Sequence, residues 1–266
     1  MVATPTPTQT LQWETVALCD HCGSAEQRVF LESPKPKWFE DRQLRLVECG
    51  GCGLVFASPR PVIADLLATI VGSAEDAQAA MERKLARKNV RAIHKKHIET
   101  AIGRLGYSPR RIFDMGCGAG TLMMEAQDMG LEAHGNDVNR VAVETLRQQG
   151  LAAHLGCTND LDLPEQSFDI VFCLDYLEHT YTPMDDLRYA FKLLRPGGLL
   201  YLKTLYLGSP GHLENGDAWH LFCNEHFYFF YPSVLRRMVE HAGFELIEVT
   251  QGTLIFVLAR RRTDQG

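Results

Sequence analysis

The chain of 266 residues has no run of about 18 apolar residues, the length that a membrane-spanning helix needs, so the sequence predicts no membrane span. It begins MVATPTPTQT, with neither the positive nor the apolar region of a secretory signal, and we therefore expect a cytoplasmic location. Internal repeats are absent. A basic excess is also missing: the net charge is −6, which argues against broad nucleic-acid binding. The hydrophobic content of 45% suffices for one α/β domain and a small appendage.

The stretch that most constrains function is RIFDMGCGAGT, residues 111–121. Arg111–Met115 reads as a buried strand, and a helix is predicted to begin at Thr121. Between them, three glycines allow the backbone to approach a ligand closely: Gly116, Gly118 and Gly120. In a dinucleotide fold, G-x-G-x-x-G places a pyrophosphate on the helix N-terminus. Here the spacing is G-x-G-x-G, and the charge of Asp114 before the turn opposes a phosphate but suits an ammonium or sulfonium group.

Asp137, twenty-one residues after Gly116, closes a second predicted strand. A carboxylate at this place can accept both hydroxyls of a ribose. A ribose together with a cation indicates S-adenosylmethionine. Here the sequence resembles the class I methyltransferases, whose D-x-G-x-G-x-G motif is matched by Asp114 and the three glycines.

Strand and helix patterns alternate through the rest of the chain, which is typical of a parallel sheet covered by helices on both faces. We predict strands at Arg111–Met115, Leu131–Asp137, Ala152–Gly156, Phe168–Leu174, Gly198–Leu205, Phe244–Thr250 and Leu254–Arg260. Helices are predicted at Thr121–Met129, Asn139–Gln149, Met184–Leu194 and Ser233–Ala242. The resemblance implies an α/β fold with a Rossmann-like, seven-stranded class I methyltransferase sheet whose last two strands form a hairpin.

Two C-x-x-C pairs precede this domain. Cys19 and Cys22 come first, and Cys49 and Cys52 follow after 26 intervening residues. A glycine after each pair permits a tight turn, so that four thiolates can surround one ion tetrahedrally, an arrangement that suits zinc. Two redox pairs are the alternative, although neither lies at a strand-to-helix junction. We predict a small N-terminal zinc ribbon, with His21 exposed and not a ligand.

The patterns divide the chain into four parts. We expect a disordered tail at 1–14, the zinc ribbon at 15–60, a helical cap or linker at 61–106 and the methyltransferase domain at 107–262. In the cap, a short helix is predicted at 63–71 and a long one from about 75 to 105. Residues 81–111 hold ten Lys or Arg and two Asp or Glu. This basic strip is either a solvated helix face or a docking strip for phosphate-bearing substrates.

By resemblance to the family, polar residues after the third and fourth strands lie at the cofactor. A side-chain oxygen of Asn159 or Asp160 could accept the adenine amine, and a plain turn is the alternative. Asp175 leaves the fourth strand, and we count it among the cofactor-binding residues. With Glu178 and His179 it resembles the acid-x-x-Glu-His by which some ubiquinone-type O-methyltransferases hold a divalent ion. Shaping the cleft by hydrogen bonds is the other role of this Glu-His pair.

The stretch from Asp217 to Tyr231 contains seven aromatic residues. We expect it to wall the substrate pocket, with packing against the sheet as the alternative. Its Glu225-His226 pair makes the sequence similar to the nucleotide-sugar C-methyltransferases, which also have a four-cysteine ribbon ahead of the methyltransferase fold. In that family the histidine of the pair is a base. This chain departs from the family in having Cys223 in place of a tyrosine, and it ends where that family continues into a third, C-terminal domain.

Histidine, with an ordinary pKa of about 6.5, can remove a proton from a hydroxyl or a carbon acid near neutral pH. We predict that His226 is the base and that Glu225 orients it; His179, His220 and a purely structural His226 are the alternatives. The sequence thus predicts methyl transfer from S-adenosylmethionine to a small molecule such as an activated sugar, a glycan or a secondary metabolite. An RNA methyltransferase that grips its substrate with the ribbon, and a binding protein without turnover, are the alternative functions.

Overall fold

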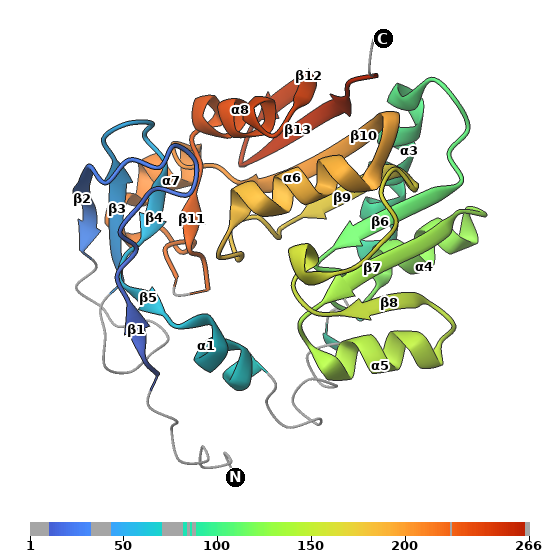
Figure 1. Ribbon diagram of the computed structural model, residues 1–266, viewed down its shortest axis with the longest axis horizontal. Helices are drawn as coiled ribbons and strands as arrows, with labels where there is room; N and C mark the ends of the chain where they lie inside the picture. Colours follow the sequence, from blue (N-terminus) through green and yellow to red (C-terminus); the bar gives the residue numbers. More distant parts are fainter. Residues whose placement is uncertain are drawn as a thin grey trace.

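The computed structural model describes residues 11–32, 44–70, 82, 83, 86, 89–223 and 225–263. The strands of these residues form three sheets, of seven, four and two strands. In Figure 1 the four-stranded sheet, built mostly from the N-terminal part of the chain, lies to one side of the seven-stranded sheet.

The seven-stranded sheet has the order β12-β13-β10-β9-β6-β7-β8. Its strands are β6 (Arg111–Met115), β7 (Glu132–Asp137), β8 (Ala152–Leu155), β9 (Phe168–Leu174), β10 (Leu194–Leu205), β12 (Phe244–Gln251) and β13 (Leu254–Arg261). From β6 the chain adds β7 and β8 on one side, and from β9 it adds β10 on the other, so the strand order reverses between β6 and β9. The final hairpin extends the β10 side, with β13 next to β10 and β12 at the edge. Open α/β sheets bind their ligands outside the carboxyl ends of the strands at such a reversal.

The seven predicted strands are confirmed, and their bounds differ by at most one residue except for β10. That strand begins at Leu194 rather than Gly198, because Leu194 pairs with Phe168 before a shift of register interrupts the ladder up to Leu199. β13 runs antiparallel to both of its neighbours, as predicted for the final hairpin.

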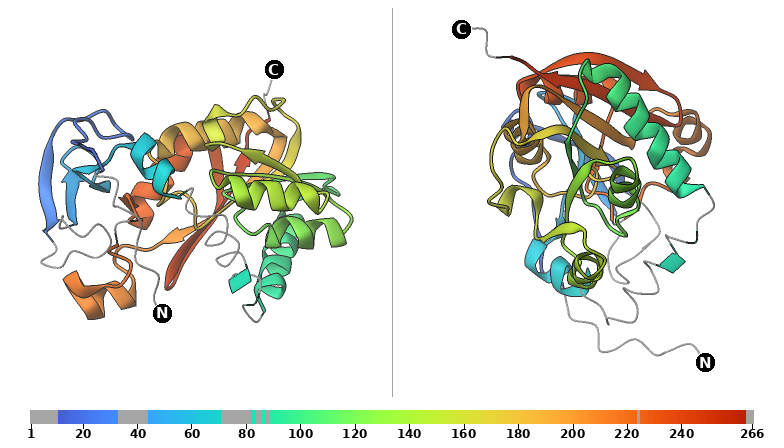
Figure 2. Two further views of the ribbon diagram at one scale, coloured as in Figure 1. Left: turned by 90° about the horizontal axis from the view of Figure 1, so that it is seen from below. Right: turned by 90° about the vertical axis from the view of Figure 1, so that its right-hand side faces the viewer.

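Helices cover both faces of this sheet, and on each face they pack against it in an apolar cluster. One face carries α3 (Val90–Leu105), α4 (Thr121–Asp128) and α5 (Arg140–Gln148), and the other carries α6 (Pro183–Leu193) and α8 (Pro232–His241). Figure 2 shows α3 along its face of the sheet. The helix starts have local causes: the side chain of Asn139 caps α5 by accepting the amide of Ala142, and prolines begin α6 and α8.

The helix predicted from about 75 to 105 is not continuous, although residues 82 and 83 are helical. Asn89 has a left-handed backbone with φ of 69°, so α3 begins at Val90 and no single helix continues through this residue. Residues 75–81, 84, 85, 87 and 88 of this predicted helix, and residue 71 of the short one, lie outside the described residues. The short helix is confirmed as α1 (Ile63–Ile70).

The N-terminal region forms two small sheets. The four-stranded sheet has the order β11-β4-β3-β2, with β2 (Gln27–Glu32), β3 (Arg45–Cys49), β4 (Val55–Ala57) and β11 (Tyr228–Phe229). β1 (Trp13–Glu14) pairs with β5 (Arg60–Pro61), so these two residues are not part of a disordered tail; residues 1–10 lie outside the described residues. Short helical segments complete the fold: η1 (Thr158–Asp160), α7 (Pro210–Asn215) and η2 (Gly216–Ala218).

The aromatic stretch is mainly core. Its members Trp219, Phe222 and Phe227–Phe230 are buried in the cluster that joins the ribbon strands to the α6 and α8 face of the large sheet. The expectation that the stretch as a whole walls a substrate pocket is therefore wrong, because most of its rings pack between two sheets. His21, expected to be exposed, is also buried, with its ring edge-to-face against His241.

Candidate active site

The glycine turn after β6 has the shape that its sequence predicts. Gly116 and Gly120 have φ of 68° and 69°, a conformation that residues with a side chain rarely adopt. A Cβ on Gly116 would lie 2.6 Å from the ring of Tyr176, and one on Gly120 would lie 2.4 Å from Leu146. The turn therefore needs glycine for both its backbone and its packing.

Asp137 is bonded to this turn. One carboxylate oxygen accepts the amide of Gly118 at 2.8 Å and the other accepts the amide of Asn139 at 2.8 Å. These bonds fix the carboxylate at the carboxyl end of β7, where the sequence predicts contacts with a ribose. Each oxygen has a second lone pair that can accept a hydroxyl.

Gly135 packs against the same turn, although no motif in the sequence singles it out. A Cβ there would lie 2.8 Å from Cys117 and 2.9 Å from the carbonyl oxygen of Asp114. The glycine thus lets β7 approach the turn after β6. Its only sequence signal is a glycine inside a strand pattern, which often marks a close backbone approach.

The other predicted cofactor residues lie along this edge of the sheet. Asp114 is buried in β6, beside Gly135 and Phe172 of the neighbouring strands. Asn159 and the exposed Asp160 lie in η1, after β8. The amide nitrogen of Asn159 donates to Thr182 at 3.0 Å, which leaves its oxygen as the acceptor that an adenine amine needs.

A second group of polar side chains lies beyond the end of β9. A carboxylate oxygen of Glu178 and one ring nitrogen from each of His179 and His226 lie within 4.8 Å of one another. The two imidazole rings meet edge-to-face with centroids 4.7 Å apart. The structure therefore joins two histidines that are 47 positions apart in the sequence.

Backbone carbonyls set the tautomers of both histidines. Nδ1 of His226 lies 2.8 Å from the carbonyl oxygen of Leu221, and Nδ1 of His179 lies 2.8 Å from that of Glu225. A carbonyl can only accept, so Nδ1 carries the hydrogen in each ring and Nε2 carries the lone pair. The prediction that Glu225 orients His226 is wrong: the side chain of Glu225 is exposed, and the carbonyl of Leu221 takes that role.

Glu178 is the buried acid of this group. Its Oε2 accepts the hydroxyl of Thr204, itself buried in β10, at 2.7 Å. Burial raises the pKa of Glu178 to about 7, and burial together with the neighbouring His179 lowers the pKa of His226. Near neutral pH, His226 is therefore an uncharged base, and Glu178 changes between its acid form and the carboxylate form that can stabilise a protonated His226.

Asp175 does not join this group. Its carboxylate forms an ion pair of 2.6 Å with Lys203 of β10, and its backbone is left-handed with φ of 51°. Among the described residues, the possible metal ligands that lie close to Glu178 are His179 and His226, and Asp175 is not one of them. The acid-x-x-Glu-His pattern therefore does not form one ligand set here. A divalent ion held jointly by Asp175, Glu178 and His179 therefore does not fit this arrangement.

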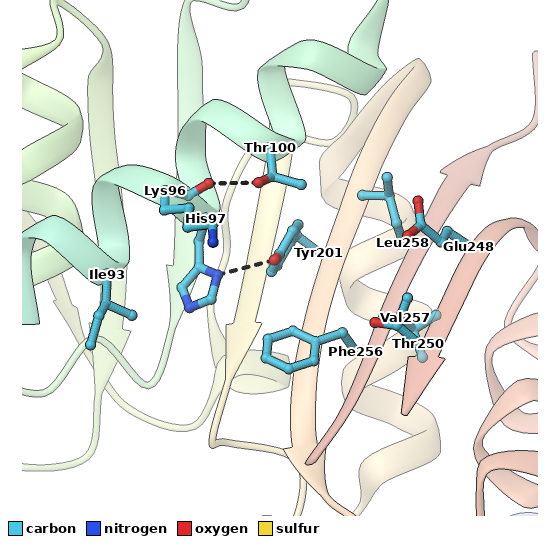
Figure 3. Close-up of a pocket in the computed structure, with 10 residues that line it drawn as sticks. All are labelled: Ile93, Lys96, His97, Thr100, Tyr201, Glu248, Thr250, Phe256, Val257 and Leu258. Carbon is cyan, nitrogen blue, oxygen red and sulfur yellow. Dashed lines mark hydrogen bonds between the residues drawn. The ribbon is translucent and has the colours of Figure 1, made fainter. Parts of the chain in front are cut away.

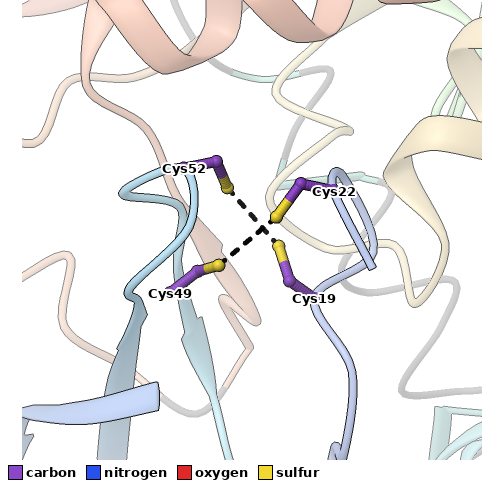
Figure 4. A group of neighbouring side chains, drawn as sticks. All are labelled: Cys19, Cys22, Cys49 and Cys52. Atoms are coloured by element: carbon purple, nitrogen blue, oxygen red, sulfur yellow. Dashed lines mark hydrogen bonds between the residues drawn. The ribbon is translucent and has the colours of Figure 1, made fainter. Parts of the chain in front are cut away.

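The four ribbon cysteines converge on one point (Figure 4). Their sulfurs all lie within 4.8 Å of one another, and the Cys19–Cys52 and Cys22–Cys49 pairs are 3.5 Å apart. Four sulfurs at 2.3 Å from one tetrahedral ion would be about 3.8 Å apart, so this donor set fits a structural zinc ion. His21 is not among the grouped donors.

A groove of about 440 Å³ lies on the face of the seven-stranded sheet that α3 covers, between α3 and strands β10, β12 and β13 (Figure 3). At its centre the ring of His97 is hydrogen-bonded to the hydroxyl of Tyr201 at 3.0 Å. Burial, followed by the charge of Lys203, lowers the pKa of His97 to about 4, so this ring is neutral at physiological pH. None of the predicted site residues lines this groove.

The fold and its two polar groups define a class. A seven-stranded sheet with one antiparallel strand, an acid before a glycine turn and a second acid at the end of the next strand are the features of an α/β protein that binds S-adenosylmethionine. Residues 77–249 match the family model described as "Methyltransferase domain". The chain belongs to this methyltransferase family.

Two curated relatives are ubiquinone biosynthesis O-methyltransferases. The protein from Coxiella burnetii is 26% identical over 175 residues, which cover 60% of this chain and 73% of that protein. The one from Proteus mirabilis is 31% identical over 130 residues, covering 46% of this chain and 49% of that protein. The chain thus spans about half to three quarters of the length of these relatives.

A solved structure shares the fold. The 1,6-didemethyltoxoflavin-N1-methyltransferase of Burkholderia thailandensis has a TM-score of 0.57 and 16% identity, over 79% of this chain and 96% of that one. The Rossmann-like methyltransferase fold is thereby confirmed. Among the described residues, no helix combines the length and the apolar character needed to cross a membrane.

Proposed function

We propose that this protein transfers a methyl group from S-adenosylmethionine to a hydroxyl of a small molecule, with His226 as the general base. The observation that carries the proposal is the His226–Glu178 pair beyond β9, next to the strand that carries the glycine turn. The ubiquinone O-methyltransferase relatives support an oxygen acceptor. Activated sugars, glycans and other secondary metabolites with a hydroxyl remain within the proposal.

The side chains divide the work as follows. The glycine turn and Asp137 hold the nucleoside, and the turn keeps a backbone amide directed at that carboxylate. When bound, S-adenosylmethionine supplies an electrophilic methyl group: the sulfur–carbon bond breaks, the oxygen–carbon bond forms, and the sulfonium becomes the thioether of S-adenosylhomocysteine. Nε2 of His226 takes the hydroxyl proton, and the carboxylate of Glu178 stabilises the resulting imidazolium.

We propose also that Cys19, Cys22, Cys49 and Cys52 bind one structural zinc ion. The support is the convergence of four sulfurs from two turns, each followed by glycine. Elemental analysis of the purified chain should give one zinc per molecule. A metal-free preparation that folds normally would contradict this proposal.

The His226→Ala variant tests the base. With labelled S-adenosylmethionine and a panel of phenols, sugars and nucleotide-sugars, we expect turnover to fall by about 10²–10⁴-fold, the usual contribution of a general base. Binding of S-adenosylhomocysteine should be unchanged. The matched control is His220→Ala, which removes an exposed histidine of the same stretch and should keep full turnover. Wild-type turnover by His226→Ala would exclude His226 as the base.

A further inference from the structure

The ribbon shares a strand with the segment that carries His226. β11 pairs antiparallel with β4, with Tyr228 opposite Phe56 and Phe229 opposite Val55. The amide of Ala57 donates to the carbonyl of Phe227 at 2.8 Å and continues this ladder. In Figure 1, β11 lies beside β4 although the two strands are far apart in the sequence.

The same segment is also hydrogen-bonded to the turn that follows β9 of the seven-stranded sheet. The amide of Phe227 donates to the carbonyl of Glu178 at 2.7 Å, and the amide of Tyr228 reaches the same oxygen at 3.3 Å. Phe227, which follows His226, therefore bonds to the ribbon through its carbonyl and to Glu178 through its amide. A displacement of β4 would be passed directly to His226.

A row of rings makes a second connection. Phe30 of β2 contacts Phe222, Phe222 contacts Phe229, and Phe229 contacts the ring of His226, with centroid distances of 6.4, 5.2 and 6.2 Å. Phe222 and Phe229 are fully buried, so this row is packed and not free to rearrange independently of the ribbon.

The cysteines set the geometry of β4. Cys49 is the last residue of β3, its amide donates to the carbonyl of Leu54 at 2.9 Å, and Val55 begins β4. The knuckle that presents two of the four sulfurs is thus also the turn that aligns β4 with β11. Zinc bound by the four sulfurs would hold this turn and, through it, the alignment of β4 with β11.

We infer that the zinc ribbon is a positioning element of the active site, which holds His226 in place by adding β11 to its own sheet. This inference rests on the proposed role of His226 and on zinc at the four cysteines. Binding of the nucleoside depends on β6 and β7, which have no strand in common with the ribbon. Loss of zinc should therefore slow methyl transfer strongly and leave nucleoside binding intact.

The test uses Cys22→Ser in the full-length chain. Cys22 is exposed, and it is far in the sequence from the paired strands β4 and β11. We expect zinc content to fall and hydrogen exchange of the Phe227 and Tyr228 amides to become at least about tenfold faster, while amides of β6 keep their protection. Affinity for S-adenosylhomocysteine should stay within about twofold and kcat should fall by roughly 10²-fold. In the Cys22→Ser background, His226→Ala should cost little more, because both changes remove the same interaction.

Two further variants separate the outcomes. Ala57→Pro removes the amide that donates to Phe227 and should reproduce the faster exchange and the lower kcat with zinc retained. Arg28→Ala, on the exposed side of the ribbon, is the matched control and should change none of these quantities.

Unchanged exchange at Phe227 and Tyr228 after zinc loss would overturn the inference, and so would a fall in nucleoside affinity equal to the fall in kcat. If the wild-type chain methylates nothing in the panel, the proposed function fails. The exchange and nucleoside-binding measurements would still decide whether the ribbon holds the segment.

Discussion

The two halves of the proposed active site, one for the cofactor and one for the acceptor, are built in opposite ways. The cofactor half, with the glycine turn and Asp137, comes from one continuous β-α-β segment in which strand β6 and its neighbour β7 meet. The acceptor half assembles Glu178, His226 and the ribbon strand β4 from three distant parts of the chain. The cofactor half is therefore expected to depend on local backbone geometry, and the acceptor half on long-range packing.

This difference means that the halves should respond separately to mutation. Changes in the cofactor half should alter nucleoside affinity, and changes in the acceptor half should alter turnover and its pH dependence. A variant of one half that changed the measured property of the other would show that the division is wrong.

The largest effect on stability and nucleoside affinity is expected from Gly120→Ala in the cofactor half. The added Cβ would stand 2.4 Å from Leu146, at a backbone φ of 69°. The left-handed backbone costs about 1–2 kcal/mol and overpacking a further 1–3 kcal/mol or so. Denaturant unfolding should show a loss of about 2–5 kcal/mol in the free energy of unfolding, and calorimetry with S-adenosylhomocysteine should show affinity reduced by more than about tenfold.

The double variant Gly120→Ala, Leu146→Ala separates the two causes. Removing the leucine side chain relieves the overlap but leaves the backbone strain and opens a cavity, so only the nucleoside affinity should partly recover. A single variant as stable and as tightly binding as the wild type would show that the turn does not need its glycine.

The same division explains what the sequence could predict. The glycines, Asp114, Asp137 and all seven strands were found because their signals are local: a fixed spacing, or one hydrophobic period at a time. The pairing of β11 with β4 has no local signal, and a two-residue strand is too short for a period. The role of the Leu221 carbonyl could not be predicted either, because every residue has the same backbone group.

The aromatic stretch was also misinterpreted because its contacts are distant in the sequence. A run of rings predicts an apolar contact but not its partner, and here the partner is a second sheet and not a substrate. Glu178 was recognised only as half of a family pair; its burial beside Thr204 and His226 follows from β10 and from the segment after Leu221, which sequence spacing does not relate.

In the acceptor half, Glu178→Gln should change how stability and turnover depend on pH. Burial raises the folded-state pKa of Glu178 from 4.5 to about 7. Between these values the folded chain holds a proton that the unfolded chain has lost, so wild-type stability decreases as pH rises through this window. Glutamine has no such proton, and relative to the wild type it should gain roughly 1–3 kcal/mol between about pH 5 and pH 8.

Turnover should move in the other direction, falling by about tenfold above pH 7, because the imidazolium of His226 loses its carboxylate partner. Unfolding and turnover measured across this pH range give both results. Glu225→Gln is the matched control, since that carboxyl is exposed, and its two pH profiles should follow the wild type. Parallel profiles for Glu178→Gln and the wild type would remove Glu178 from the acceptor half.

The smallest effect is expected from Arg91→Ala, in the basic strip that belongs to neither half. The exposed guanidinium of Arg91 pairs with Glu125 at 2.8 Å and with Asp128 at 2.5 Å, both on the neighbouring helix α4. Exposed pairs contribute at most about 1 kcal/mol and are screened by salt, so the free energy of unfolding should fall by less than that, and by still less at high ionic strength. Because two carboxylates already engage this charge, KM for phosphate-bearing and phosphate-free acceptors should change equally and by less than about twofold. A rise in KM confined to the phosphate-bearing acceptors would instead make this helix face a docking strip and extend the acceptor half onto α3.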